Sequence, residues 1–556
     1  MKIILSLMIL LLPWHSMAGS NKELKIGVSQ EFENLNQLIS QMAATSYIYN
    51  FVARKLVDMD HEGKRYPGIV KEIPTLENKK AKIIGKDKKR HIVAEWEIKD
   101  NVVWGDGKPV TGHDVKFSWE VALSKNVSVG ETEVYKQIKS IEIDPKNPKK
   151  FTLIYKEAKW NFNQLLTYVI LPKHIEGPIF NKYKNVAGGY EKHSAYVTQP
   201  ANPALYNGPY LLTDVKLGSH VVLKKNPKFF GNAAKIEKVV IKVIPSTATL
   251  EANLRSGVID MISIFGLAFD QAVAFNKKVK SQNLPFEVKF KQSLIYEHID
   301  LQLSNELLSD INVRKALIYS INRKDLTKAL FDGKLEPAIH NIAPIDKWFT
   351  DDPSKIVLYK YSRRKARKLF EKAGWIKGKD GYRYKNGKKL SIQLMTTSGN
   401  KTRELVEVYL QDQWKKVGVH ITIKNEQARV YFGETVRKSK FPGMAMFAWI
   451  SSPENNPRST FHSKSIPTKE NGYSGQNSSR WSNKTVDDLI DKVDLEFNET
   501  KRIEMVHQIL KAYTDEVPVI PLYYRADIAV TPKGMRGHKL NGHQFSSSNH
   551  AEFWTF

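Results

Sequence analysis

Residues 102–123, which read VVWGDGKPVTGHDVKFSWEVAL, carry the clearest structural signal in this sequence. The Gly-Asp-Gly run at 105–107 predicts a tight turn. Thr111 then stands three positions before Asp114, the arrangement in which a hydroxyl and an acid cap the free N–H groups at the start of a helix. Apolar side chains follow at helical spacing, at Val115, Trp119 and Leu123. The stretch therefore predicts a turn followed by an amphipathic helix with one buried face.

Beyond this stretch, strand-like and helical patterns alternate along the chain. Strand-like runs lie at 24–28, 151–155, 211–215, 221–225 and 239–243, and helical patterns lie at 313–320, 364–373 and 403–417. This alternation predicts an α/β architecture. Linker-like composition at residues 199–203 and 515–521 marks the two places where we expect the chain to cross between lobes.

The first eighteen residues predict export. Lys2 supplies a positive start, residues 3–12 an apolar core, and residues 16–18 (Ser-Met-Ala) a small-x-small cleavage site. The apolar core is about half as long as a membrane-spanning helix needs to be. We therefore expect a signal peptide over residues 1–18, a mature protein that begins at Gly19, and a periplasmic location. The sequence contains no cysteine, so we expect neither a lipid anchor nor a disulfide framework.

Size and charge restrict the class of protein further. A chain of 556 residues exceeds what one hydrophobic core usually organises, so at least two lobes are expected. The formal net charge is +28, with short basic runs at 86–90, 363–368 and 385–389 that are interleaved with acids. No nucleic-acid-binding signature accompanies them. We interpret the charge as a solvated surface and expect no nucleic-acid partner; an anionic partner such as lipid headgroups or cell-wall polymer is the alternative.

Motifs of exported enzymes are missing from the sequence. It contains no His-Glu-x-x-His, no Gly-x-Ser-x-Gly and no phosphate-binding Gly-rich loop. One Ser-x-x-Lys occurs, at Ser362 and Lys365, but no Lys-Thr-Gly accompanies it, and the serine is expected to cap a helix. The fifteen histidines show no metal-site spacing. We therefore expect no catalytic residues, no cofactor and no metal.

Seven segments, in order, share one resemblance. They are LKIGVSQEFENLNQ (24–37), the stretch 102–123, YNGPYLL (206–212), INVRKALIYSINRKDLTKALFDGKLEPA (311–338), ARKLFEKAGW (366–375), WISSP (449–453) and EVPVIPLYY (516–524). Their order and spacing resemble the family 5 extracellular solute-binding proteins, a periplasmic class that includes oligopeptide-, dipeptide- and nickel-binding proteins.

The resemblance implies a two-lobed α/β periplasmic-binding-protein fold, type II and cluster C-like, with an extra domain inserted in the N-terminal lobe. Lobe I would comprise residues 19–55, 196–290 and 518–556, the extra domain residues 56–195, and lobe II residues 291–517. The ligand would lie between the lobes, which would close on it about the two crossovers.

The resemblance also implies where the ligand lies. Trp449 would form part of the cleft wall. The other candidate ligand-binding residues are Ser451, Ser452 and Glu454 in the following turn, Asn477, and the pair Gln30 and Glu31 after the first strand.

The sequence departs from the family pattern at this site. Peptide-binding members usually place an aspartate shortly after the tryptophan, where it pairs with the α-ammonium of the ligand. Here the two nearest polar residues are serines, and the nearest acid is Glu454. Either Glu454 takes over the role of the aspartate, or Ser451 and Ser452 form neutral hydrogen bonds with an uncharged ligand end.

The function implied by the resemblance is that of the periplasmic binding component of an ABC importer. Such a protein would capture peptides or peptide-like solutes and deliver them to an inner-membrane permease and ATPase complex, acting as a monomer and not as an enzyme. Two alternatives remain open at this point: a receptor of the same family for a non-peptide solute, and an exported protein or enzyme that binds cell-wall polymer.

We predict that the protein purified from the cell envelope begins at or within a few residues of Gly19, because signal peptidase cleaves after small-x-small sequences. Intact-mass analysis checks this directly. A mass that includes Met1 would contradict the prediction.

Overall fold

The computed structural model describes residues 22–556 except 31, 33, 41, 87–88, 128, 130–131, 428–429, 472, 474 and 546. The predicted signal peptide, Gly19 and Glu31 lie outside the described residues.

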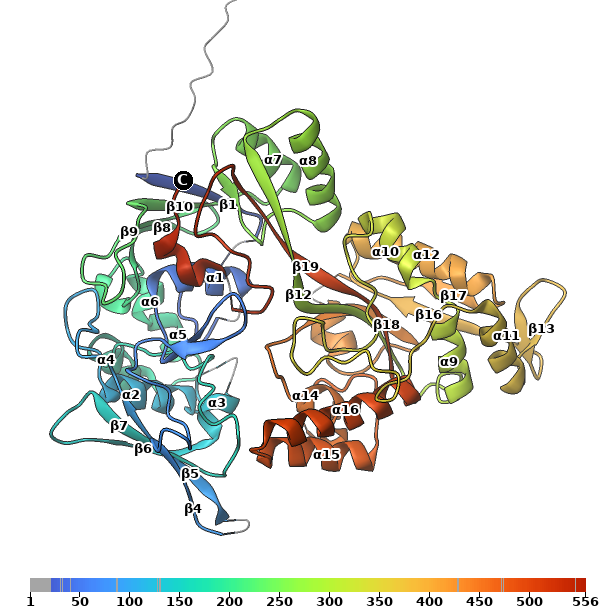
Figure 1. Ribbon diagram of the computed structural model, residues 1–556, viewed down its shortest axis with the longest axis horizontal. Helices are drawn as coiled ribbons and strands as arrows, with labels where there is room; N and C mark the ends of the chain where they lie inside the picture. Colours follow the sequence, from blue (N-terminus) through green and yellow to red (C-terminus); the bar gives the residue numbers. More distant parts are fainter. Residues whose placement is uncertain are drawn as a thin grey trace, which may run out of the picture.

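A ten-stranded sheet runs through both halves of the molecule (Figure 1), in the order β17-β16-β18-β12-β19-β11-β1-β10-β9-β8. The strands of the N-terminal half are β1 (Glu23–Val28), β8 (Tyr210–Lys216), β9 (His220–Lys225), β10 (Lys238–Val243) and β11 (Met261–Ile262). Those of the other half are β16 (Ser391–Met395), β17 (His420–Ile423) and β18 (Met444–Ile450). The expected two-lobed α/β architecture is present.

Two long strands, β12 (Phe286–Leu301) and β19 (Val519–Pro532), connect the halves. They pair antiparallel from Phe286 opposite Pro532 to Asp300 opposite Val519, with register shifts after Gln292 and after Glu297. The predicted lobe boundaries at 290/291 and 517/518 fall within β12 and immediately before β19.

One of the two expected crossovers is therefore wrong. The chain does cross at β19, which begins inside the predicted stretch 515–521. Residues 199–203 instead lead from α6 (Ala195–Thr198) into the first residue of η2 (Pro203–Leu205), both in the N-terminal half. The actual first crossover is a continuous strand whose backbone groups are paired in a ladder, so it needs none of the Pro and Gly residues by which linkers are recognised.

The region expected to be an extra domain shares its core with lobe I. It contains the hairpin β2 (Val57–Met59) and β3 (Arg65–Pro67), and a sheet of β4 (Ala81–Ile84), β5 (His91–Glu97), β7 (Lys150–Tyr155) and β6 (Ile138–Ile143). Its helices are α2 (Gly112–Ala122), α3 (Glu133–Lys136), α4 (Lys173–Tyr183), α5 (Gly189–His193) and α6. A single hydrophobic cluster joins this region to β1, β10 and α1 (Ala43–Val52), so the two pack as one unit.

The helix predicted at 112–123 is confirmed as α2. The Thr111 side chain accepts a hydrogen bond from the backbone N–H of His113 at 3.3 Å, and Asp114 accepts one from the backbone N–H of Thr111 at 2.8 Å. This reciprocal cap satisfies N–H groups that have no partner within the helix.

The remaining helices of lobe I are α7 (Thr247–Arg255), α8 (Phe269–Ser281) and η5 (Ser547–Phe553). Lobe II contains α9 (Ile311–Tyr319), α10 (Arg323–Phe331), α11 (Arg363–Lys372), α12 (Lys401–Lys415), η3 (Tyr431–Val436), α14 (Arg458–Phe461), η4 (Ser463–Ser465), α15 (Lys484–Leu495) and α16 (Glu499–Glu516). A small sheet of β13 (Ile376–Lys377), β14 (Arg383–Lys385) and β15 (Lys388–Lys389) projects from its outer end. Within the described part of the chain, no helix combines the length and apolar character needed to cross a membrane.

Candidate functional site

The halves of the molecule touch at several places besides the crossover strands, among them the packing of Phe269 on α8 against Phe331 on α10, with ring centroids 5.6 Å apart. Two further contacts lie close to the candidate site. The first is Trp160, which follows β7 in the N-terminal half. Its ring centroid lies 6.0 Å from that of Trp348 in lobe II, and the guanidinium of Arg502 on α16 lies 4.0 Å from its centroid. The backbone N–H of Trp160 donates to the carbonyl oxygen of Asp494 at 3.2 Å. Trp160 is thereby nearly buried between the two halves.

The second contact is an ion pair. Arg65 on β3 lies 3.6 Å from one carboxylate oxygen of Glu454 in lobe II, and Lys347 lies 3.1 Å from the other. The Glu454 side chain is only 7% exposed, so these cations offset the cost of burying its charge. Its backbone φ is 54°, in the left-handed region that costs a non-glycine residue on the order of 1 kcal/mol.

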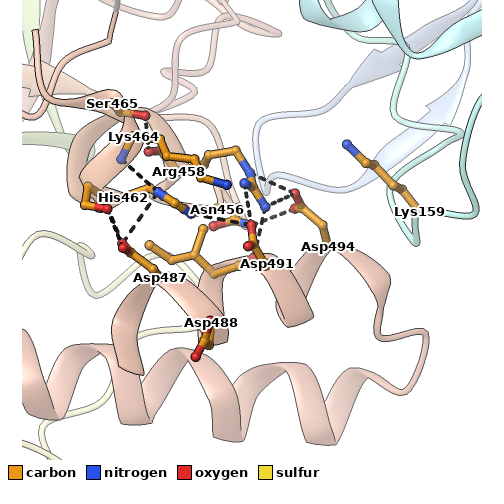
Figure 2. Close-up of polar contacts among 12 residues, drawn as sticks. Lys159, Asn456, Arg458, His462, Lys464, Ser465, Asp487, Asp488, Asp491 and Asp494 are labelled. Atoms are coloured by element: carbon orange, nitrogen blue, oxygen red, sulfur yellow. Dashed lines mark hydrogen bonds and ion pairs between the residues drawn. The ribbon is translucent and has the colours of Figure 1, made fainter. Parts of the chain in front are cut away.

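A network of charged side chains supports this part of lobe II (Figure 2). Arg458 on α14 pairs with Asp491 at 2.6 Å and with Asp494 at 2.9 Å, both on α15. Asn456 also donates to Asp494, at 2.6 Å. The side chain of Asp494 therefore holds the segment that leads from β18 into α14. Its backbone carbonyl oxygen accepts the hydrogen bond from the backbone N–H of Trp160 in the other half.

That segment lines a cavity of about 60 Å³ in lobe II. Trp449 stands near the end of β18 directly opposite Tyr296 of β12, and both side chains line the cavity with Ser451 and Ser452. Trp449 is half-buried and packs edge-on against Phe447, with ring centroids 5.3 Å apart. Its side chain thus belongs both to the core and to the cavity wall.

A buried carboxylate, Asp346, lies in the wall of the same cavity. One of its oxygens accepts the backbone N–H of Trp348 at 2.8 Å, and the other accepts that of Glu454 at 2.9 Å. Asp346 is 7% exposed, and no ion pair joins it to a cation among the described residues. Burial raises the pKa of its carboxyl to about 6, because desolvation outweighs the two backbone hydrogen bonds.

Two neutral groups of the cavity wall are also without partners. Among the residues that the structure describes, nothing pairs with the indole Nε1–H of Trp348 or the side-chain oxygen of Asn341, and both residues line the cavity. The residues around the cavity therefore include an acid, an unpaired N–H donor and an unpaired amide acceptor beside aromatic rings, a composition that suits a small polar or cationic group.

The structure separates the candidate residues into two sets. Trp449, Ser451 and Ser452 come together in the cavity. Asn477 is fully buried outside it, and its amide donates to the carbonyl oxygens of Phe461, His462 and Trp481. Asn477 therefore holds a loop, because its hydrogen-bonding capacity is used within the protein. Its neighbour Gln476 lines the cavity instead. Gln30 is exposed after β1.

Sequence reasoning missed Asp346 entirely. It is brought to Trp449 by a loop that follows α10, far from Trp449 in the sequence, and it belongs to no recognisable motif. The signal that could have found it is an acid two positions before a tryptophan in a Pro-containing loop, which is too common to select one residue.

A second cavity, of about 310 Å³, lies in the N-terminal half. Its lining is mostly polar and includes Gln37, Ser46, Asn50, Lys55 and Phe545. Lys55 is nearly buried, its ammonium lies 5.4 Å from the ring centroid of Phe545, and burial lowers its pKa. This cavity can accept hydrogen bonds and offers one cation.

Ser362 has a structural role, and acidic and histidine side chains do not gather into a metal site among the described residues. The described residues contain no group of three or more His, Cys, Asp or Glu side chains placed to hold a metal ion. Ser362 accepts the backbone N–H of Lys365 at 3.2 Å, so it caps α11 as expected.

The chain is similar in sequence to bacterial solute-binding proteins. Residues 90–469 match the family described as bacterial extracellular solute-binding proteins, family 5 Middle. The chain is 27% identical over 447 residues to the oligopeptide-binding protein AppA of Bacillus subtilis (strain 168), a match that covers 80% of this chain and 78% of that protein. It is 24% identical over 443 residues to the nickel-binding periplasmic protein of Escherichia coli (strain K12), covering 78% of each.

Among solved structures, an oligopeptide binding protein from Thermus thermophilus, complexed with a pentapeptide, is similar in fold. The TM-score is 0.77 at 27% identity, and the match covers 96% of each chain.

We predict that Trp160→Ala loosens the contact between the halves by on the order of 2 kcal/mol, because it removes a buried indole. Hydrogen exchange at the C-terminal end of α15 and along α16 should become faster, and small-angle scattering should give a larger radius of gyration. Trp160→Phe, which keeps an aromatic ring, serves as the control and should stay close to the wild type. Unchanged exchange and radius in Trp160→Ala would contradict a contact that holds the halves together.

Proposed function

This chain belongs to the bacterial extracellular solute-binding proteins of family 5, and from that premise we propose that it captures peptides or peptide-like solutes between its lobes for an ABC importer. It would act in the periplasm, where the closed, loaded protein would deliver its ligand to an inner-membrane permease and ATPase complex. The relatives named for oligopeptide binding support the peptide class. The finding that carries the proposal is a cavity beside the interlobe contacts, lined by Trp449, Ser451, Ser452 and Asp346.

We propose that Asp346, and not Glu454, pairs with a cationic group of the ligand. Glu454 already has Arg65 and Lys347 as partners and is not part of the cavity wall. Asp346 is buried, lines the cavity and has no cation of its own among the described residues. A ligand ammonium would supply the missing charge, and Trp449 and Trp348 would offer it aromatic faces.

Closure would link ligand binding to the arrangement of the lobes. Trp348 lines the cavity on one side and packs against Trp160 of the N-terminal half on the other. The backbone N–H of Glu454 binds Asp346, while its side chain binds Arg65 of the N-terminal half. A ligand that orders Asp346 and Trp348 would thereby favour the closed state, as a population shift requires.

The identity of the ligand is the most direct test of the proposed function. We expect mass spectrometry of material released by denaturing the purified protein to show peptides or peptide-like compounds that carry a free amine. A metal complex or a sugar as the released solute would contradict the peptide class, and an empty protein that binds no member of a peptide library would contradict it as well.

The second prediction concerns Asp346→Asn. It should weaken binding of a free-amine peptide by roughly 2 to 5 kcal/mol, because the ammonium loses its charged partner in a closed cavity. The N-acetylated form of the same peptide should lose far less.

In the wild type, affinity for the free-amine peptide should be full above pH 6 and should fall about tenfold per pH unit below it, because protons compete for a carboxyl whose pKa is about 6. The peptide amine stays protonated over this range, so Asp346→Asn should show no such fall.

Calorimetric titration at pH 5, 6 and 7 measures these differences. Glu454→Gln is the matched control: it also removes one carboxylate, but it should weaken the free and acetylated peptides equally, by on the order of 1 kcal/mol, through loss of the contact with Arg65. The assignment of Asp346 is rejected if Glu454→Gln selectively weakens the free-amine peptide while Asp346→Asn does not.

A further inference from the structure

The outer end of lobe II holds a disproportionate share of the positive charge. Residues 359–389 contain thirteen Lys or Arg and two acidic residues, a formal charge of +11 out of +28 for the whole chain. This segment of 31 residues forms α11 and the small sheet β13-β14-β15, which lie at the end of lobe II remote from the N-terminal half. We call the exposed Lys and Arg side chains of α11, of residues 376–389 and of the last turn of α12 the basic face.

Hydrogen bonds join the parts of the basic face into one surface. Lys385 on β14 donates to the carbonyl oxygen of Ala373, at the end of α11, at 2.9 Å. Arg367 on α11 donates to the carbonyl oxygen of Lys416, at the end of α12, at 3.3 Å. The small sheet and the end of α12 are therefore both held against α11, the helix that begins with the basic run at 363–368.

The charge of the basic face is not neutralised within the protein. Its acids are already engaged, since Glu371 faces Arg383 at 3.5 Å and Asp380 faces Lys389 at 3.8 Å. Six exposed cations take part in none of the ion pairs found among the described residues: Arg363, Arg364, Lys368, Lys372, Lys377 and Lys379. Such a concentration of like charge destabilises the protein by self-repulsion unless an anionic partner neutralises it.

We infer that the basic face docks the protein onto a bilayer surface that contains anionic phospholipids. Long Lys and Arg side chains in an exposed array can match headgroup phosphates that are mobile in the plane of the membrane, and each adds attraction that decays within a Debye length. Ile376 on β13 is 60% exposed among these cations and supplies an apolar side chain that can enter the headgroup region. Docking through this end leaves the contacts between the halves, at Trp160 and Glu454, free of the membrane.

The test is vesicle flotation with the full mature protein. Vesicles of phosphatidylcholine alone are compared with vesicles that also contain about 30% phosphatidylglycerol, at about 50 and about 300 mM salt. We expect binding only to the anionic vesicles, and release at the higher salt concentration. A variant with Arg364, Lys368, Lys372 and Lys377 each changed to Gln should partition onto the anionic vesicles at least tenfold less.

The control variant carries Lys82→Gln, Lys125→Gln, Lys216→Gln and Lys224→Gln, four exposed positions in the N-terminal half without ion pairs among the described residues. It has the same net charge as the first variant, and it should bind within twofold of the wild type. Equal melting temperatures and equal retention of co-purified solute would show that both variants are folded.

Three results would overturn the inference: no binding of the wild type to anionic vesicles, an equal loss in both variants, or binding of the wild type to a DNA duplex or an anionic polysaccharide without binding to vesicles. None of these results depends on which solute the cavity holds, so the lipid inference and the proposed function can fail separately.

Discussion

The antiparallel pairing of β12 with β19 is the constraint on which the rest of the structure depends. Both strands pass from one half of the molecule to the other, and their ladder extends over nearly the full length of each. Ladder hydrogen bonds resist separation of the strands but tolerate changes of twist. We therefore expect the lobes to move by bending or twisting this ribbon, with the register shift after Gln292 as its weakest point. The contacts of Trp160 with Trp348 and of Glu454 with Arg65 are among those that a separation of the lobes would break.

The cavity of lobe II contains a buried carboxyl group, Asp346, that has no cation partner among the described residues. An acid whose pKa is raised from 3.8 to about 6 favours its protonated form in the folded protein. At neutral pH, where this carboxyl is ionised, its burial lowers the free energy of unfolding by on the order of 3 kcal/mol. This loss of stability disappears as the pH falls through 6 toward 4. A bound cation reverses this balance, because it stabilises the ionised form. If Asp346 binds a ligand cation as proposed, binding would recover the stability that its buried charge costs.

A feature of the fold or the site could be predicted from the sequence where the residues that produce it are close together in the chain. Thr111 caps α2 through contacts within one turn, so that helix could be predicted, whereas Asp346 reaches the cavity from a distant loop and no local pattern marks it. Composition suggested a crossover at 199–203, but the chain crosses in a regular strand, which carries no linker signal. The basic runs at 363–368 and 385–389 are separated in the sequence, which favours the interpretation of a solvated surface, whereas in the structure Lys385 reaches the end of α11.

The most direct test of the proposed ligand site is a crystal structure of the protein with its co-purified solute. We expect a ligand between the lobes with a cationic nitrogen within hydrogen-bonding distance of an Asp346 carboxylate oxygen and in contact with the ring of Trp449. A ligand that places an anionic or uncharged group against Asp346, or that binds away from Trp449, would contradict it.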